Sequence, residues 1–440
     1  MNHLSPRTVV HVQLAERLRT LASDGARGVY AVFWLGDLPL GHEYFDPEEL
    51  PIGPRDLAMV AADCVTLAVA AHLFEGSQPP SPAQPSSPRG TAVSYGAAAA
   101  AADALARLRA RHESRQATGN LRVTVAVMTR NRPGDLARCL RALQHLTPRP
   151  RQVMVVDIGS QHDQTQAVVD SFGDRVDAPG DPGAGWATKV EGDIVAFTDD
   201  RCTPHPAWLQ ALAAAFRDRA LGAVSGLVLP AELETEAQVA FERLLGGAHL
   251  GFQPATYNHR WLRGRRSALG PQRPRRLGTS ANLAVRTDWL HAIHAATGFT
   301  ALHQLERLAR SDLWHRLVAS GAHGRYEPAA VVFRHHPTDL KEIEDAAFSW
   351  PSDLGAATRS VDHGIQGARD AAAVSSANFV VIAARNILLG TRVERRLVKA
   401  GIAGYVSNRV PRRRAVGQRH DKLGTTLPGA AAAPHASSEL

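Results

Sequence analysis

The sequence has 440 residues, enough for about two or three domains, and its hydrophobic content of 44% is ordinary for a globular protein. The formal net charge of +8 fits an anionic partner such as a nucleotide phosphate, a nucleic acid or a membrane surface, although arginine-rich coding alone can raise the charge. The three cysteines lack paired or CxxC spacing, which argues against a disulfide framework or a zinc site and favours a reducing cytoplasm.

The first 74 residues predict a small α+β module. Residues 28–45 contain two β-rich runs around Gly36 and Asp37, a pattern typical of a hairpin, and residues 55–73 have the apolar density of a packed helix. Residues 75–94 are rich in Pro and Ser, so they predict a linker rather than a packed core.

Residues 95–337 predict a second, larger α/β domain. It starts with an Ala- and Arg-rich helix near residues 95–115, after which strands and helices alternate. The alternation predicts a doubly wound, mostly parallel sheet with right-handed crossovers. The expected strands are 121–129, 152–160, 193–200 and 222–230, and the expected helices between them are 130–146, 162–173 and 206–218.

Polar loops follow three of these strands, at the edge where such sheets bind ligands. Asp157 can accept hydrogen bonds from a base or a ribose, with Gly159 permitting close approach, or it can cap the helix that follows. Asp199 and Asp200 can hold a divalent cation against a diphosphate, or they form a solvated acidic turn. Because these acids end strands of one sheet, the combination favours a nucleotide pocket.

Five segments, "VAVMTRNRPGDLARCL" (125–140), "VVDIGS" (155–160), "GDIVAFTDDRCTPHPAWL" (192–209), "GTSANLAVRTDWL" (278–290) and "DLWHRLVASGAHGRYEPAAVVFRHHP" (312–337), have a recognisable order and spacing. Together they resemble the family-two inverting glycosyltransferases, which have the GT-A fold. The resemblance covers about half of the chain, residues 121–337.

The resemblance implies a nucleotide-sugar donor, an acceptor hydroxyl and inversion at the transferred sugar. It assigns the metal to Asp199 and Asp200, and the sugar or acceptor side to Gly278, Asn282 and His335. His335 can equally belong to a structural turn. The nucleotide-binding positions that it implies are Thr129, Arg130, Asn131, Asp157, Gly159, Ser160 and Arg201.

The sequence also departs from the family pattern. Ile158 replaces a second acid, Arg201 replaces the third acid of the metal cluster, and an Arg–Asn pair is not visible in residues 181–189. The resemblance implies a divalent cation, Mn²⁺ or Mg²⁺, whereas Arg201 argues against it, because a guanidinium can itself bind phosphate through two donors.

The catalytic base is the most serious departure. The family's Glu–Asp pair falls on Ala309 and Arg310, which leaves Glu306 and Asp312 as candidate bases, since inverting transfer needs a base near the acceptor hydroxyl. Asp312 is also the natural match to a second, structural acid of the family.

Two functions from different classes follow. The first is a glycosyltransferase in bacterial glycan, envelope or glycosylated-metabolite assembly, acting on a glycan, a lipid-linked or a small-molecule acceptor. The alternative is a catalytically inactive GT-A-fold binding or regulatory protein. Catalysis stays possible if the carboxylate of Glu306 or Asp312 lies within about 6–8 Å of the Asp199–Asp200 pocket. A nucleotidyltransferase is a weaker option, because no Gly-rich phosphate loop follows the first strand.

Basic segments outside the sheet raise the question of further partners. Residues 260–276 hold seven arginines and no acid. The segment could form a flexible flap over an anionic donor or acceptor, or it could be a solvated loop. A helical region (338–408) and a basic, then low-complexity tail (409–440) can lie on anionic lipid or pack on the domain. No nucleic-acid partner is expected, since no groove-reading motif accompanies the charge.

The expected location is the cytoplasm. Peripheral contact with the inner face of the membrane is a further expectation. The N-terminus lacks the apolar core of a signal peptide. No stretch reaches 18 uncharged apolar residues, the length that spans a bilayer.

Overall fold

The computed structural model describes residues 5–23, 25, 27–74, 95–116, 121–160, 164–173, 176–177, 189–243, 251–258, 265–267, 270–272, 280–291 and 321–343. The expected linker, the arginine-rich loop apart from two short strands, Gly278, Glu306, Asp312 and everything from residue 344 onward lie outside these residues.

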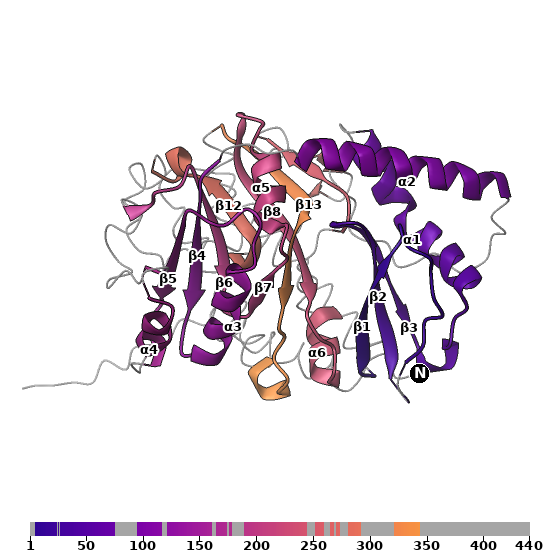
Figure 1. Cartoon of the computed structure of the whole chain (residues 1–440), viewed down its shortest axis with the longest axis horizontal. Coiled ribbons are helices and arrows are strands. Elements are labelled where there is room, and N and C mark those ends of the chain that lie inside the picture. The colour runs from indigo at the N-terminus through magenta and orange to yellow at the C-terminus, as the bar shows by residue number, and fades with distance from the viewer. Residues whose placement is uncertain are drawn as a thin grey trace, which may run out of the picture.

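The N-terminal module is a three-stranded sheet covered by one long helix (Figure 1). Strands β2 (Gly28–Leu35) and β3 (Leu38–Phe45) form the expected antiparallel hairpin, and Gly36 adopts a φ of 62° that favours glycine at this turn. Strand β1 (Arg7–Gln13), which the sequence analysis did not identify, pairs in parallel with β2. After a short 3-10 turn (Pro47–Glu49), helix α1 (Pro54–Leu73) packs on β3.

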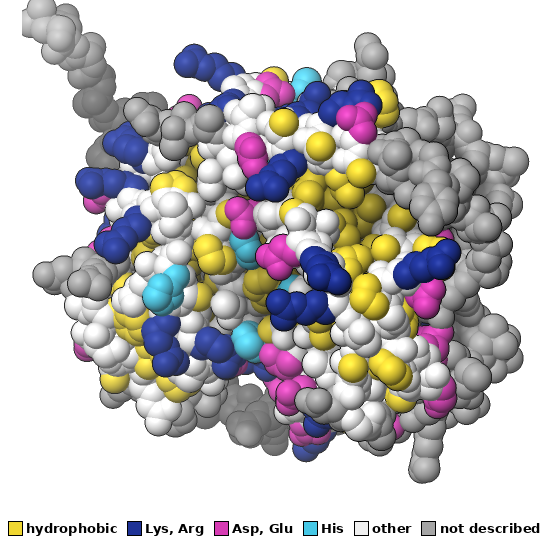
Figure 2. Space-filling model, turned by 45° about the vertical axis from the view of Figure 1, so that its right-hand side comes forward, with side chains coloured by type: hydrophobic (Ala, Val, Ile, Leu, Met, Phe, Trp, Pro, Cys, Tyr) yellow, Lys and Arg dark blue, Asp and Glu magenta, His cyan; other side chains and the backbone are white. Residues whose placement is uncertain are grey.

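Helix α1 is apolar on more than its packed face. Within the described residues it is long and apolar enough to cross a membrane by length and composition alone, a criterion that a core helix also meets. Leu57, Ala61 and Val65 are buried, whereas Leu67 and Phe74 are 70% and 75% exposed. Figure 2, which brings this side of the molecule forward, shows hydrophobic side chains grouped among charged ones. Its buried residues make α1 part of the core of the module.

The main sheet has eight strands, in the order β5-β4-β6-β12-β8-β13-β7, and β9 pairs with the other end of β13. The parallel pairs are β5 with β4, β4 with β6, and β8 with β13. The bounds are β4 (Val123–Thr129), β5 (Gln152–Asp157), β6 (Ile194–Asp199), β7 (Cys202–Pro204), β8 (Leu221–Pro230), β9 (Ala255–Tyr257), β12 (Leu283–Arg286) and β13 (His323–Arg334). A separate hairpin joins β10 (Arg265–Ser267) to β11 (Gly270–Gln272).

The α/β class and the first strand–helix alternations are confirmed, but the sheet is mixed rather than mostly parallel. Strand β12 is inserted between β6 and β8 and runs antiparallel to both. β7 and β9 also run antiparallel to β13. The reason is that strand direction depends on which neighbour a strand pairs with, and β12 is only four residues long. An apolar run of that length carries no information about its direction.

Helices α3 (Pro133–Leu143), α4 (Gln164–Ser171) and α5 (Trp208–Ala215) follow β4, β5 and β7, and α6 (Glu236–Phe241) follows β8. Pro133 occupies the first turn of α3, where its missing N–H costs nothing, so the loop after β4 passes directly into a helix. The turn therefore holds residues 130–132 at the carboxyl end of the sheet.

The N-terminal module packs directly against the main sheet. Helix α2 (Tyr95–Gln116) contacts both α1 and α5 and lies across the top of Figure 1. The backbone N–H of Arg7 donates to Leu233 O at 2.7 Å. The Trp34 ring stacks on His205, with 5.4 Å between centroids. These contacts join the module to segments that follow β7 and β8.

Candidate active site

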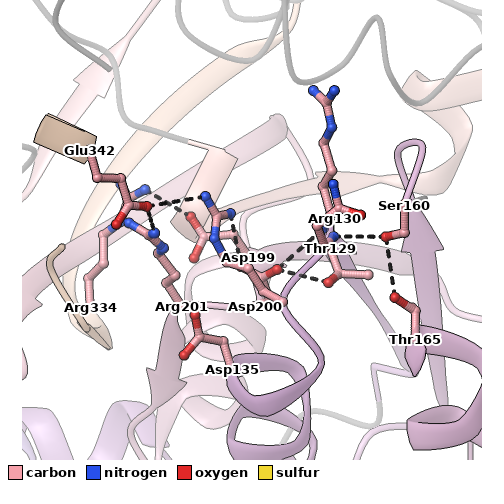
Figure 3. Close-up of polar contacts among 12 residues, drawn as sticks. Thr129, Arg130, Asp135, Ser160, Thr165, Asp199, Asp200, Arg201, Arg334 and Glu342 are labelled. Carbon is pink, nitrogen blue, oxygen red and sulfur yellow. Dashed lines mark hydrogen bonds and ion pairs between the residues drawn. The ribbon is translucent and has the colours of Figure 1, made fainter. Parts of the chain in front are cut away.

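The carboxyl ends of β4 and β6 bring the first loop and the acidic pair together. In this parallel pair Met128 lies opposite Asp199, so Thr129 and Asp200 meet just beyond the register. The Thr129 hydroxyl donates to Asp200 Oδ2 at 2.8 Å, and the backbone N–H of Arg130 reaches the same oxygen at 3.4 Å (Figure 3). The spatial neighbourhood expected for these residues is therefore present.

Asp200 is a buried carboxyl group, 2% exposed. Burial, followed by the negative charge of Asp199, raises its pKa to about 6. The hydrogen bond from Thr129 and the charge of Arg132 act in the opposite direction. The Arg132 guanidinium lies 3.7 Å from Asp200 Oδ1. Both oxygens of Asp200 thus face cations or hydrogen-bond donors of the protein.

Asp199 is held by an arginine from the other half of the sheet. Arg334, the last residue of β13, places Nη2 3.3 Å from Asp199 Oδ2, and this carboxylate raises the pKa of Arg334. The other oxygen, Oδ1, is buried without a hydrogen-bond partner of normal geometry in the described residues. The Cys202 thiol also interacts with the Asp199 carboxylate, and its pKa is raised first by burial and then by the charge of Asp199.

Arg201 points to a third acid, Glu342, in the turn that follows β13. Its Nη2 makes a short contact with Glu342 Oε1, and Nη2 of Arg132 lies 3.7 Å from the same oxygen. Figure 3 shows Glu342 reaching over the carboxyl ends of the strands toward Arg201. The corner formed by Asp199, Asp200, Arg132, Arg201, Arg334 and Glu342, here called the charged corner, alternates acids and guanidiniums.

The acids of the charged corner do not fit a divalent cation as they are arranged. Mg²⁺ and Mn²⁺ need accessible oxygen ligands, but Asp200 already faces Thr129, Arg130 and Arg132, and the free oxygen of Asp199 is buried. Within the described residues no group of three His, Cys, Asp or Glu side chains could hold a metal. Three guanidiniums, those of Arg132, Arg201 and Arg334, lie at the same edge.

The loop after β5 is closed by its own polar groups. Asp157 Oδ1 accepts from the backbone N–H groups of Gly159 at 3.1 Å and Ser160 at 2.7 Å, and Gly159 has a φ of 100°. The Ser160 hydroxyl accepts from the backbone N–H of Asn131 at 2.8 Å. Asp157 thus stabilises the turn itself, and it accepts from residues that precede α4 rather than from the helix that the sequence analysis expected it to cap. Contact of Asp157, Gly159, Ser160 and Asn131 with a nucleotide stays a prediction.

The amide of Asn282 is engaged inside the protein, and its contact with the sugar or acceptor stays a prediction. Its side chain is fully buried; Nδ2 donates to Leu227 O and Ala330 O at 2.8 and 2.7 Å, and Oδ1 accepts from Trp208 at 2.9 Å. These bonds tie β8, β13 and α5 together. The amide is therefore committed to the core, because an unpaired polar group there would cost free energy.

His335 likewise belongs to a turn in this structure. Its Nδ1 lies 2.6 Å from Glu232, and its Nε2 lies 3.1 Å from the hydroxyl of Thr203. The backbone N–H of His335 donates to Arg201 O at 2.9 Å. Both ring nitrogens have protein partners, so His335 fixes the Arg201 backbone rather than presenting a free nitrogen to a ligand.

Sequence analysis did not assign site roles to Arg132, Arg334 and Glu342. Arg132 lies in the first polar loop and Arg334 directly precedes His335, so both had a positional signal. Glu342 had none, since it is one acid in an acidic segment. Gly278, Glu306 and Asp312 lie outside the described residues, and their assigned roles stay predictions.

Comparisons with known proteins place these loops in context. Residues 124–239 match the family model described as Glycosyl transferase family 2. Two strains of Mycobacterium tuberculosis have a pre-mycofactocin glycosyltransferase that is 29% identical over 254 residues, which cover 54% of this chain and 48% of the relative. The chain thus spans about half the length of these curated relatives.

Solved structures resemble the chain more distantly. A mannosyltransferase from Pyrobaculum calidifontis, in complex with GDP-Man and Mn²⁺, aligns with a TM-score of 0.40 and 16% identity, covering 66% of this chain and 88% of its own. TarS from S. aureus aligns with a TM-score of 0.38 and 13% identity, covering 66% and 81%.

Proposed function

We propose, from the match of residues 124–239 to the glycosyltransferase family 2 model, that the protein transfers a sugar from a nucleotide-sugar donor to an acceptor hydroxyl. The observation that supports the proposal most directly is that the matched segment, residues 124–239, contains β4, β5 and β6, whose carboxyl ends form the polar edge around Thr129 and Asp200. The same match favours an enzyme over an inactive binding protein.

The described residues suggest how the departing nucleoside diphosphate is stabilised. Leaving-group charge needs preorganised cations in a partly water-excluded site. Arg201 is 13% exposed at its side chain and Arg132 is 40% exposed, so both border solvent at this edge. A guanidinium can bind phosphate oxygens through two parallel hydrogen bonds. The base that receives the proton of the acceptor is assigned to Glu306 or Asp312, as the sequence predicts.

The acceptor that we propose is a small glycosylated metabolite rather than an envelope glycan. This choice rests on the name of the curated relative, a pre-mycofactocin glycosyltransferase, at 29% identity over about half of each chain. A bacterial source, a cytoplasmic location and peripheral membrane contact through the basic C-terminal region belong to the same proposal. A lipid-linked acceptor is the competing choice if that region binds anionic vesicles.

The test is a transfer assay with UDP-, GDP- and dTDP-sugars, each with pre-mycofactocin and with lipid-linked acceptors. Release of nucleoside diphosphate together with the product mass reports transfer. We expect Asp200→Asn to lower kcat/KM at least about 100-fold. The substitution removes the negative charge that Thr129, the backbone N–H of Arg130 and Arg132 face at the carboxyl end of the sheet.

The matched control is Glu191→Gln. It removes an acid that pairs with Arg151 at 3.0 Å, just before β6 and therefore at the opposite edge of the sheet. This variant keeps full activity. If no donor gives nucleotide release and no nucleotide binds, the catalytically inactive GT-A-fold protein becomes the better description.

A further inference from the structure

One carboxylate oxygen contacts two arginines at the charged corner. Glu342 Oε1 is in short contact with Arg201 and lies 3.7 Å from Arg132. Arg132 and Arg201 lie in the segments that follow the parallel neighbours β4 and β6, whereas Glu342 lies in the segment that follows β13. An oxyanion between two guanidiniums occupies the position that a phosphate oxygen would take.

The acids at this corner differ in how firmly they are held. Asp199 and Asp200 extend from the end of β6 and are 20% and 2% exposed at their side chains, but Glu342 is 44% exposed. The turn that carries Glu342 is anchored at its neighbours: Lys341 N–H donates to the side chain of Asp339 at 2.9 Å, and Ile343 is fully buried. A change of side-chain rotamer therefore removes Glu342 from the arginines without unfolding the turn.

Charge indicates what happens when Glu342 leaves. With it, three arginines face three acids; without it, Arg132, Arg201 and Arg334 face only Asp199 and Asp200. Arg334 stays paired with Asp199, so the excess positive charge lies on Arg201 and Arg132. This pair then presents donors to an anion at the carboxyl end of the sheet, where ligands of such sheets bind.

We propose that Arg132 and Arg201 form the diphosphate subsite of the donor and that Glu342 fills it until a nucleoside diphosphate takes its place, with no divalent cation required. The inference rests on the proposed function and specifies its donor site. The Glu342 carboxylate competes with the diphosphate for Arg132 and Arg201. These two guanidiniums supply the positive charge that a metal ion bound to Asp199 and Asp200 would otherwise provide.

The test is calorimetric titration of UDP, GDP and dTDP, and of inorganic pyrophosphate, into the full chain with EDTA or with Mn²⁺. We expect binding in EDTA, tightened about two- to fivefold in Glu342→Gln, the range that loss of a partly exposed ion pair gives. Arg201→Gln weakens binding at least about tenfold, since a charge-assisted contact is lost. Glu191→Gln, which breaks an Arg–Glu pair at the opposite edge, changes nothing.

Pyrophosphate separates the diphosphate subsite from the rest of the donor pocket. An equal gain for pyrophosphate and for the nucleotides in Glu342→Gln supports competition at the diphosphate itself. A gain for the nucleotides alone would contradict it. Thermal unfolding of Arg201→Gln confirms that the variant is folded, and Glu342→Gln carries the proposal independently, as a gain of affinity cannot come from misfolding.

Failure of this inference is distinguishable from failure of the proposed function. Nucleotide binding that requires Mn²⁺, is abolished by Asp200→Asn and is unchanged in Glu342→Gln would overturn the arginine subsite while leaving the transferase in place. An unchanged metal-free affinity in Glu342→Gln would also overturn it. If no nucleotide and no pyrophosphate binds under any condition, both proposals fail together.

Discussion

The charged corner and the interface of the N-terminal module are both assembled from distant parts of the chain, but by different physics. The corner opposes arginines to acids that are partly open to solvent. The interface instead relies on aromatic contacts, such as Trp34 on His205, and on histidines whose pKa burial lowers. Ion pairs can exchange one partner for a ligand, whereas a buried neutral contact has no replacement in solution. The charged corner is therefore suited to ligand binding, whereas the interface is suited to holding the N-terminal module on the main sheet.

Arg334→Leu tests whether the corner also contributes to stability, and it has the largest expected effect. Removing this guanidinium leaves Asp199 partly buried without its cation. We expect a loss of about 2–3 kcal/mol of unfolding free energy, less than for a fully buried pair, because a quarter of the Arg334 side chain is exposed. Urea unfolding measures it, with Arg334→Lys as the control that keeps the charge. Equal stability of both variants would mean that the ion pair contributes nothing.

The pH dependence of stability tests the interface. Burial lowers the pKa of His72 from 6.5 to about 4, and its Nε2 donates to Phe252 O at 3.2 Å. Glu327, His112 and the cation Arg325 also face it, and burial lowers the pKa of His112 as well. A depressed histidine pKa means that the unfolded chain binds the proton first. The contribution of His72 is therefore complete above about pH 6.5 and is lost as the pH falls toward 4.

We expect the chain to lose about 2 kcal/mol from this histidine between about pH 8 and pH 5. Urea unfolding of the wild type and of His72→Gln at both pH values measures it. The amide of Gln keeps a donor but does not titrate, so the acid-induced loss should be smaller in the variant by that amount. Parallel pH profiles would show that His72 titrates normally.

Asp157→Ala extends the comparison to the loop after β5, whose backbone N–H groups are hydrogen-bonded by a side chain of the same loop. The substitution removes the acceptor of two backbone N–H groups, from Gly159 and Ser160. We expect a loss of about 1 kcal/mol of stability, the usual cost of a lost capping group, and a smaller loss in Asp157→Asn, whose amide oxygen still accepts. A large loss of nucleotide affinity in the folded Asn variant would instead favour the ribose or base contact that the sequence also allows.

Salt gives the smallest expected effect and separates the two regions most cleanly. Raising NaCl from about 0.05 to 0.5 M should weaken nucleoside diphosphate binding a few-fold, because partly exposed charges are screened over a shorter Debye length. The thermal stability of His72→Gln relative to the wild type, at about pH 8, should change little over the same range, because the interface contact of His72 joins neutral groups. Salt-independent affinity would argue against Arg132 and Arg201 as the phosphate donors.

Local signals in the sequence predicted local features well. Gly36 marks the hairpin, Pro133 marks the start of α3, and the apolar runs before Thr129, Asp157 and Asp199 place these residues at strand ends. Strand β1 was missed, since its pattern of exposed and buried residues is irregular. Strand β12 was not predicted either, since it is only four residues long, and its antiparallel direction is decided by pairing rather than by composition.

The sequence by itself determined that polar loops gather at one edge of an α/β sheet, because parallel neighbours end on the same side whatever else the chain does. It also determined that Arg201 stands beside two acids. Only the tertiary structure decided which charges these residues meet: Arg334 and Glu342 reach the corner across more than 100 residues of chain, and Glu342 is 141 positions after Arg201. Electrostatic partners are chosen by proximity in space, and sequence spacing does not encode that proximity once the order of strands in the sheet departs from their order in the chain.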